Sequence, residues 1–149
     1  MIIREFNPND LKRIIEIENM SFEESYGSNM FRKLYDIGTG FLVAECDGLV
    51  VGYIIFWIKQ EGLGHVISLA VDKNYRKKKV ASSLLRKAIT IFKSMHIDKI
   101  TLEVNVNNKS AIDFYKKFNF IIDREVPNYY NNKDAALVMH FIFKNYQKE

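Results

Sequence analysis

The stretch from His65 to Leu85 constrains the fold of this chain more than any other. It begins with His65-Val-Ile-Ser-Leu-Ala-Val71, a short apolar and β-branched run that is typical of a buried strand. It ends in a helix whose apolar residues share one face: Val80, Ala81, Leu84, Leu85, Ala88, Ile89, Phe92 and Met95. Four basic residues, Arg76 to Lys79, lie in the turn between them. Such a turn directs free backbone N–H groups and the positive end of a helix dipole at one place, which suits a phosphate.

Length and composition bound the class of protein. The 149 residues suffice for one core, and we expect a single domain over residues 1–149. The net charge of +4 favours anionic partners such as nucleotides, nucleic acid or an anionic surface, without choosing among them. Cys46 is the only cysteine, so no intramolecular disulfide can form. No apolar run approaches about 20 residues and the start lacks a signal-peptide pattern, so we expect a cytoplasmic protein without a membrane span.

The patterns before residue 65 predict a strand, two helices and a hairpin. A strand over 2–6 is followed by Asn7-Pro8-Asn9-Asp10, a helix entry, and by an amphipathic helix to about Met20. Ser28 is a candidate cap for a short second helix. Strands over 40–45 and 49–58 flank Asp47-Gly48, a strong two-residue hairpin signal.

The patterns after the long helix predict a strand over 99–104, a helix over 110–118, and strands over 120–126 and 135–143. Asn119 is a candidate left-handed stop for the helix over 110–118, because asparagine tolerates positive φ. The predicted class is mixed α/β, with about seven strands and about four helices in the order β-α-α-β-β-β-α-β-α-β-β. The strand-helix-strand unit from His65 to Val104 should be a parallel crossover.

Two short motifs resemble signatures of the GNAT N-acetyltransferases. Arg76-x-x-Lys79-x-Ala81 resembles their acyl-CoA pyrophosphate loop, Gln/Arg-x-x-Gly-x-Gly/Ala, with Lys79 in place of a glycine. Asn108-Lys-Ser-Ala111-Ile-Asp-Phe-Tyr115, followed by Asn119-Phe120, resembles Asn-x-x-Ala-x-x-x-Tyr followed by Gly-Phe. The likeness spans nearly the whole chain and implies the GNAT fold, with a mixed central sheet. A positive φ at Lys79 would cost about 1–2 kcal/mol, whereas helical geometry would simply add a charge for a CoA phosphate.

Within that family, the chain is most similar to the protein N-terminal acetyltransferases, including the ribosomal-protein alanine type. The resemblance rests on the strand from His65 to Val71, on Leu102-Glu103-Val104 before Asn108, and on Pro127-Asn-Tyr129-Tyr130 with Asp134-Ala135 and Met139. Phe22-x-x-x-Tyr26 resembles their substrate loop. The implied reaction moves the acetyl group of acetyl-CoA to a free protein α-amino group by direct attack in a ternary complex. The implied partners are protein or peptide N-termini, with ribosomal proteins or nascent chains as candidates.

The reaction needs a neutral amine, a donor for the oxyanion and a proton for the thiolate. The resemblance makes His65 and Glu103 the candidate bases and Tyr115 the candidate acid. It does not decide which of His65 and Glu103 is the base. It assigns oxyanion stabilisation to backbone N–H groups over Leu69, Ala70 and Val71. The candidate acetyl-CoA ligands are those three residues with Arg76, Lys77, Lys78, Lys79, Val80, Ala81, Ser82, Asn108, Ala111 and Tyr115.

The candidate acceptor-binding residues are Phe22, Glu24, Tyr26, Tyr129 and Tyr130. Adjacent tyrosines in a strand point to opposite faces, so one of Tyr129 and Tyr130 should face the substrate while the other packs. His96 and His140 have no metal-ligand spacing, and we expect no metal.

Each of these residues also has a plain structural reading. His65 could be a hydrogen-bonded strand histidine, Glu103 a solvated strand residue and Tyr115 a core aromatic. Asn108 could simply cap its helix.

Two alternative functions stay open at the level of sequence. A GNAT enzyme could act on a lysine side chain, a small amine or a polyamine. A basic chain could also be an RNA- or ribosome-binding module without catalysis. Aromatic residues are not interleaved with the basic run, and no nucleic-acid motif occurs, which argues against the module. The sequence does not indicate an oligomeric state or the preferred N-terminal residue.

Overall fold

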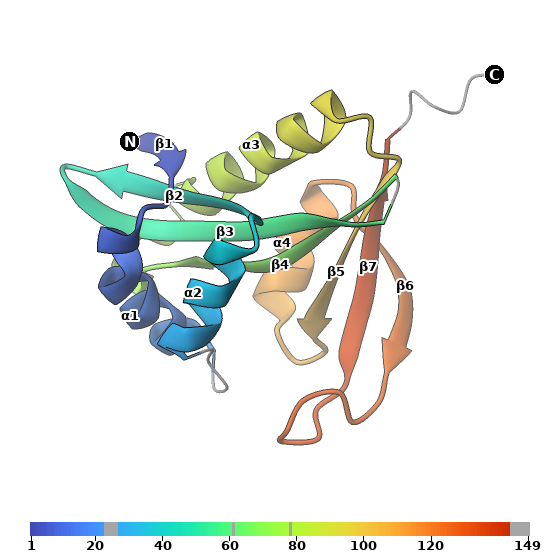
Figure 1. The fold of residues 1–149 in the computed structure, drawn as a ribbon. Helices are drawn as coiled ribbons and strands as arrows, with labels where there is room; N and C mark the ends of the chain where they lie inside the picture. The colour runs from blue at the N-terminus through green and yellow to red at the C-terminus, as the bar shows by residue number, and fades with distance from the viewer. Residues whose placement is uncertain (23–26, 61, 78, 144–149) are drawn as a thin grey trace. The chain divides into compact units, whose positions relative to one another are not determined.

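The computed structural model describes residues 1–22, 27–60, 62–77 and 79–143. The described elements, labelled in Figure 1, are β1 (Ile2–Glu5), a 3-10 turn (Pro8–Asp10), α1 (Leu11–Ser21), α2 (Ser28–Asp36), β2 (Gly40–Cys46), β3 (Leu49–Gln60), β4 (Leu63–Val71), a second 3-10 turn (Lys73–Tyr75), α3 (Val80–Ser94), β5 (Lys99–Asn105), α4 (Lys109–Lys117), β6 (Ile121–Val126) and β7 (Ala136–Ile142). The predicted order of strands and helices is confirmed. Gly27, and not Ser28, is the N-cap residue of α2, so the predicted cap is one residue out.

Seven strands form one hydrogen-bonded sheet in the order β1-β2-β3-β4-β5-β7-β6. Among the registers that the structure describes, β4 and β5 are parallel and the other pairs are antiparallel. The parallel ladder is short: it joins Leu63–His65 to Lys99–Thr101 and does not continue beyond these residues. On its other side, β5 pairs with β7 over its full length. The predicted parallel crossover is therefore confirmed.

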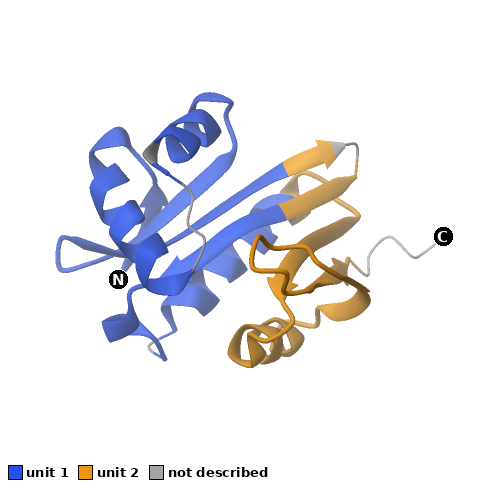
Figure 2. Ribbon diagram, turned by 90° about the horizontal axis from the view of Figure 1, so that it is seen from below, with its two compact units in different colours: residues 1–57, 66–92 blue, residues 58–65, 93–149 orange. Residues whose placement is uncertain are grey.

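The chain divides into two compact units, which Figure 2 shows in different colours. Unit 1 comprises residues 1–57 and 66–92, and unit 2 comprises residues 58–65 and 93–149. The two long strands β3 and β4 contribute residues to both units. The basic turn and α3 belong to unit 1, whereas β5, α4 and the last two strands belong to unit 2.

Unit 1 has an aromatic and aliphatic core between its first helices and its strands. Ile14 and Ile17 of α1 and Phe31 of α2 are fully buried against Phe41 and Tyr53 of the sheet. Burial of a large aliphatic or aromatic side chain stabilises a fold by about 1.5–3 kcal/mol. The i, i+3 spacing in α1 explains why this helix presents an apolar face to the sheet.

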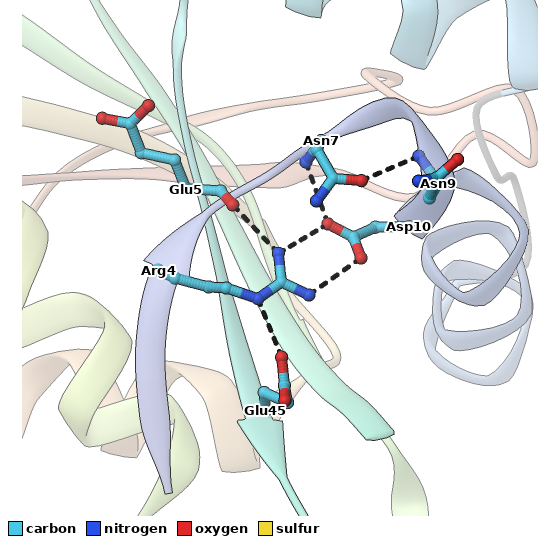
Figure 3. Close-up of polar contacts among 6 residues, drawn as sticks. All are labelled: Arg4, Glu5, Asn7, Asn9, Asp10 and Glu45. Atoms are coloured by element: carbon cyan, nitrogen blue, oxygen red, sulfur yellow. Dashed lines mark hydrogen bonds and ion pairs between the residues drawn. The ribbon is translucent and has the colours of Figure 1, made fainter. Parts of the chain in front are cut away.

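A polar network fixes the start of unit 1, as Figure 3 shows. The Arg4 guanidinium donates to both carboxylate oxygens of Asp10, at 2.9 and 3.0 Å, and to Glu45 Oε1 at 2.8 Å. The backbone N–H of Asn7 donates to Asp10 Oδ2 at 2.9 Å, and Asn7 Oδ1 accepts from the N–H of Asn9. Asn7 thus caps the 3-10 turn in the predicted helix entry, and Asp10 in return accepts from the Asn7 N–H, which completes a capping box.

Unit 2 packs α4 with its three C-terminal strands. Tyr115 of α4 lies edge-on against Phe120, whose ring lies 5.5 Å from that of Phe141 on β7. Asn119 has a φ of 71°, so the predicted left-handed stop after α4 is confirmed. β6 is the terminal strand of the sheet, and its register to β7 shifts between Ile122 and Arg124.

Candidate active site

The basic turn of unit 1 begins from a buried aspartate directly after β4. Asp72 is 4% exposed; its N–H donates to Val51 O at 2.8 Å, and its carboxylate accepts from the Asn74 N–H and from Arg13 Nη2. Burial raises the pKa of this carboxyl, but the hydrogen bonds from Asn74 and Arg13 outweigh burial and lower it. Asp72 is therefore ionised at neutral pH and ties the start of the turn to β3 and to α1.

Arg76, a predicted pyrophosphate ligand, contacts the protein itself. Its Nε donates to Val71 O at 3.1 Å, and its Nη2 donates to Ser21 Oγ, also at 3.1 Å. Arg76 thus joins the end of β4 to the last residue of α1. Sequence reasoning missed this contact, because Ser21 is 55 positions away and carries no motif that points to an arginine.

Two lysines of the turn have left-handed backbone conformations. Lys77 has a φ of 64° and Lys79 a φ of 67°, and both side chains are exposed. Lys79 therefore has the positive φ for which the family glycine is suited, and not ordinary helical geometry. Each such residue costs about 1–2 kcal/mol relative to the right-handed region. Lys78, predicted for the same role, lies outside the described residues.

The start of α3 lies close to the sheet of unit 1. Val80, Ala81 and Ser82 form its first turn, where backbone N–H groups have no acceptor within the helix. A Cβ on Gly52 of β3 would lie 3.0 Å from Val80 Cγ1 and 3.2 Å from Ala70 O. Glycine at this position therefore permits the close approach of the helix start to β3 and β4.

In unit 2, the two candidate bases contact each other. His65 Nε2 lies 3.2 Å from Glu103 Oε1, and the side chains of His65 and Glu103 are 12% and 26% exposed. The second imidazole nitrogen, Nδ1, lies 2.9 Å from Thr101 Oγ1. His65 and Thr101 are register partners in the parallel ladder, and alternate residues of β5 share a face, so Thr101 and Glu103 both reach the imidazole.

The charge state of Glu103 follows from its surroundings. The hydrogen bond from His65 lowers the pKa of Glu103 most strongly, burial opposes this, and the charges of His65, Lys59 and Arg124 lower the pKa further. Glu103 is thus a carboxylate at neutral pH. Burial and the charge of Glu103 raise the pKa of Tyr129, which keeps that phenol neutral. The arrangement can hold a cationic amine and accept a proton.

The ring of Tyr115 is buried in unit 2. The side chain packs edge-on against Phe114 and Phe120, and the residue is 8% exposed. Its hydroxyl has no hydrogen-bond partner within residues 1–22, 27–60, 62–77 and 79–143. Burial raises the pKa of this phenol well above its usual range. The hydroxyl is therefore protonated and available as a donor to a bound molecule.

Asn108 caps α4. Its Oδ1 accepts from the N–H of Ala111 at 3.1 Å, so the structural role that the sequence left open is present. The side-chain amide N–H groups of Asn108 point to no partner that the described part of the chain provides. Asn108 can therefore cap the helix through its oxygen and still donate to a bound molecule through its nitrogen.

Tyr129 and Tyr130 lie in the turn between β6 and β7, and not in a strand as the alternation argument assumed. Their rings contact each other edge-on at 4.9 Å, so the prediction that they point to opposite faces is wrong. Both N–H groups donate to Asp134 O, at 3.1 and 3.2 Å. The Asp134 carboxylate accepts from Asn105 Nδ2 and Asn132 Nδ2, which anchors the turn to the end of β5.

The other predicted site residues are less informative. Phe22 follows α1 in extended conformation and is 37% exposed. Glu24 and Tyr26 lie outside the described residues. Within the part of the chain that the structure describes, no group of three or more His, Cys, Asp or Glu side chains could hold a metal ion. No described helix has the length and apolar character needed to span a membrane.

Comparison with known proteins identifies the family. A sequence model of the acetyltransferase (GNAT) family matches residues 11–120, which is more than half of the chain. This chain is a GNAT acetyltransferase. The membership agrees with the predicted fold and favours an acyltransferase over a binding module without catalysis.

Three relatives of this GNAT chain carry informative names. An N-alpha-acetyltransferase of Saccharolobus solfataricus is 35% identical over 92% of this chain and 90% of its own length. The crystal structure of Ard1 from Thermoplasma volcanium has a TM-score of 0.92 at 31% identity, covering 95% of this chain and 96% of the other. Arabidopsis thaliana Naa50, in complex with the bisubstrate analogue CoA-Ac-MVNAL, has a TM-score of 0.83 at 25% identity, covering 95% and 98%.

Proposed function

We propose that this GNAT enzyme is an N-α-acetyltransferase that transfers the acetyl group of acetyl-CoA to the free α-amino group of protein N-termini. The observation that carries the proposal is the contact between His65 and the ionised Glu103, 3.2 Å apart in unit 2. The names of the relatives support it, because one is an N-alpha-acetyltransferase and another binds a CoA–peptide conjugate.

The pKa of Glu103 favours an α-amino group over a lysine side chain. The reference pKa of an α-ammonium group is about 7.7–8.0, whereas that of a lysine ammonium group is about 10.4. Glu103 is a weak base, since its pKa is lowered by His65. A weak base can complete the deprotonation of a group that is already partly neutral, whereas a lysine needs about 2.5 pK units more help.

The turn of unit 1 supplies groups that fit the donor. Acetyl-CoA, when bound, supplies the acetyl group as an activated thioester. The first-turn N–H groups of α3, over Val80, Ala81 and Ser82, can hold pyrophosphate oxygens. Lys77 and Lys79 add positive charge, and Arg76 keeps the turn attached to β4 and α1. Backbone N–H groups over Leu69–Val71 are the proposed donors to the oxyanion.

Unit 2 supplies the proton-transfer groups. Glu103 accepts a proton from the α-ammonium, directly or through one water. Tyr115 gives its proton to the departing thiolate, because its hydroxyl is neutral and free among the described residues. Asn108 and Ala111 are proposed contacts for the pantetheine arm, and Tyr129 and Tyr130 for the acceptor peptide.

A matched pair of peptides tests the acceptor. One peptide has a free N-terminus and no lysine; the other has a blocked N-terminus and one internal lysine. We expect acetylation of the first to be faster with acetyl-CoA, measured by mass spectrometry. A mixed library of N-terminal peptides then gives the residue preference. Faster acetylation of the blocked lysine peptide would refute the proposal and favour the lysine or small-amine reading.

Calorimetry tests the donor. Acetyl-CoA should bind at low salt and more weakly as salt rises, because charge neutralisation contributes to binding. The double variant Lys77→Ala plus Lys79→Ala should bind less tightly than the native protein. The double variant Lys87→Ala plus Lys93→Ala, which removes two exposed lysines farther along α3, is the matched control for net charge. Equal affinity for all three proteins would contradict the assignment of the turn.

A further inference from the structure

The turn that carries Tyr129 and Tyr130 has a strained backbone and contains no glycine. It joins β6 to β7 over residues 127–135 (Figure 1). Asn128 has a φ of 55° and Lys133 a φ of 75°, so a left-handed residue lies on each side of the tyrosine pair. This region is unfavourable for a residue with a Cβ. The turn therefore depends on further contacts to keep a single conformation.

Asp134 supplies such contacts through its backbone and its side chain. Its carbonyl oxygen accepts from the N–H groups of Tyr129 and Tyr130, at 3.1 and 3.2 Å. Its carboxylate oxygen Oδ2 accepts from Asn132 Nδ2 at 3.1 Å and from Asn105 Nδ2 at 3.0 Å. The hydrogen bond from Asn105 lowers the pKa of Asp134 most strongly, so this carboxyl is ionised at neutral pH. One residue thus holds the tyrosine pair and attaches it to β5.

Asn105 is itself held in place on β5. Its Oδ1 accepts from the N–H of Asn107 at 2.9 Å, which leaves its amide N–H groups to face Asp134. It is the last residue of β5, two positions after Glu103, so the two side chains share a face of the strand. The charge of Glu103 contributes to the raised pKa of Tyr129, so that phenol lies within reach of the charge. The contact between Asn105 and Asp134 therefore helps to set where the tyrosine pair lies relative to the candidate base.

We propose that Asp134 is a positioning residue for the acceptor, which holds the Tyr129–Tyr130 pair beside Glu103 through its contact with Asn105. This inference rests on the proposed function. The proposed pyrophosphate ligands belong to unit 1 and the proposed pantetheine contacts to α4, whereas Asp134 bonds to the turn and to β5. Loss of its carboxylate should therefore weaken binding of the N-terminal peptide and leave binding of acetyl-CoA unchanged.

A set of variants isolates this contact. Asp134→Ala removes the acceptor, and Asn105→Asp places a second carboxylate against it. In the double variant Asn105→Asp plus Asp134→Asn, the amide at position 134 donates to the carboxylate at position 105, so the contact forms in the reverse direction. Asp134→Asn alone keeps an acceptor oxygen and should behave much like the native protein. Asp113→Ala, at an exposed aspartate of α4, is the control for the loss of one carboxylate.

Amide hydrogen exchange, followed by NMR, tests the anchor without any acetylation. In Asp134→Ala and in Asn105→Asp, the N–H groups of Tyr129 and Tyr130 should exchange faster by about 10-fold, as for the loss of one hydrogen bond to a charged group. The N–H groups of β7 should exchange as in the native protein, and the double variant should restore native exchange in the turn. Native exchange of the two tyrosines in both single variants, or faster exchange throughout β7, overturns the proposal.

Steady-state kinetics tests the role in acceptor binding. The same two single variants should raise KM for a free N-terminal peptide by about 10-fold, with a smaller change in kcat, and should bind acetyl-CoA with native affinity in calorimetry. The double variant should restore KM. Equal losses of peptide and acetyl-CoA binding would show a merely structural role, and a native KM would overturn the role in acceptor binding. If no N-terminal peptide is acetylated, the proposed function fails, while hydrogen exchange still decides whether Asp134 holds the turn.

Discussion

Arg4 holds both carboxylate oxygens of Asp10, at 2.9 and 3.0 Å, and so joins β1 to the entry of α1 (Figure 3). Asp10 is 7% exposed, whereas the Arg4 side chain is 31% exposed. Burial raises the pKa of Asp10, but the hydrogen bonds from Arg4 and from the Asn7 N–H outweigh it, and the pKa is lowered overall. Because of this ion pair, the stability of the protein should depend on pH in a way that can be measured.

Asp10→Asn should destabilise the protein at neutral pH by about 2 kcal/mol, because it leaves Arg4 without its buried carboxylate. A carboxyl whose folded pKa is lowered contributes stability above its unfolded pKa of about 3.9, and loses it as pH falls through the folded pKa. The difference between native protein and variant should therefore shrink below about pH 4. Urea unfolding across pH measures it. Glu5→Gln is the control: its carboxylate points away from Arg4 in Figure 3, and it should unfold like the native protein at each pH.

Lys79→Gly should stabilise the protein by about 0.5–1 kcal/mol, because glycine adopts the left-handed conformation without the Cβ penalty of about 1–2 kcal/mol. The greater freedom of glycine in the unfolded state offsets only part of this gain. Thermal unfolding should show a Tm higher by about 2–4 °C per kcal/mol for a chain of this length. Lys73→Gly is the matched control, since Lys73 is exposed in the same turn and has no positive φ. A stabilisation by Lys73→Gly as large as that by Lys79→Gly would contradict the argument from backbone strain.

Glu103→Gln should lower kcat/KM for a free N-terminal peptide by about 10²–10⁴, as expected for the loss of a general base. The deficit should narrow above about pH 8, where the α-amino group is already neutral. His65→Ala should also lower the rate, since the carboxylate loses its N–H donor. Glu125→Gln on β6 removes one exposed carboxylate and should keep the native rate. A deficit for Glu103→Gln that is constant across pH would rule out proton removal as its role.

Tyr115→Phe should lower kcat by about 10²-fold or more and leave the affinity for CoA nearly unchanged, because an acid acts mainly in the transition state. The melting temperature should stay close to native, since the lost hydroxyl bonds to no residue that the structure describes. Stopped-time assays with calorimetry of CoA binding separate the two effects. Tyr35→Phe, a change at an exposed tyrosine of α2, is the control. Equal losses of affinity and turnover would make Tyr115 a binding residue and not an acid.

Local patterns predicted most of the fold, because each strand and helix has its own periodicity and punctuation. Asp47-Gly48 specified a hairpin, and both residues indeed have positive φ. Asn119 stopped α4 in the conformation that its side chain tolerates. The cap of α2 was placed one residue late, because serine was preferred over the glycine before it. Gly27 needs no side chain to begin a helix, so it carried little signal.

The sequence indicated several residues of the candidate site but few of the contacts between them. The contact between His65 and Glu103 joins two strands that are far apart in sequence, and the resemblance indicated both residues without indicating their distance. Thr101 could have been found, because it shares the face of Glu103 two residues earlier on β5. The hydrogen bond from Arg76 to Ser21 could not have been found, since no local pattern specifies which distant helix end an arginine will reach.

The terminal strand β6 affects how molecules of this protein can associate at high concentration. All of its residues but the last are exposed, Asp123 sits where the register shifts, and Arg124 and Glu125 follow. An open strand edge invites pairing with another chain, and charges and bulges on that edge oppose it. Crowded molecules of this enzyme therefore meet an irregular, charged border at β6, which disfavours growth of the sheet from one molecule into the next.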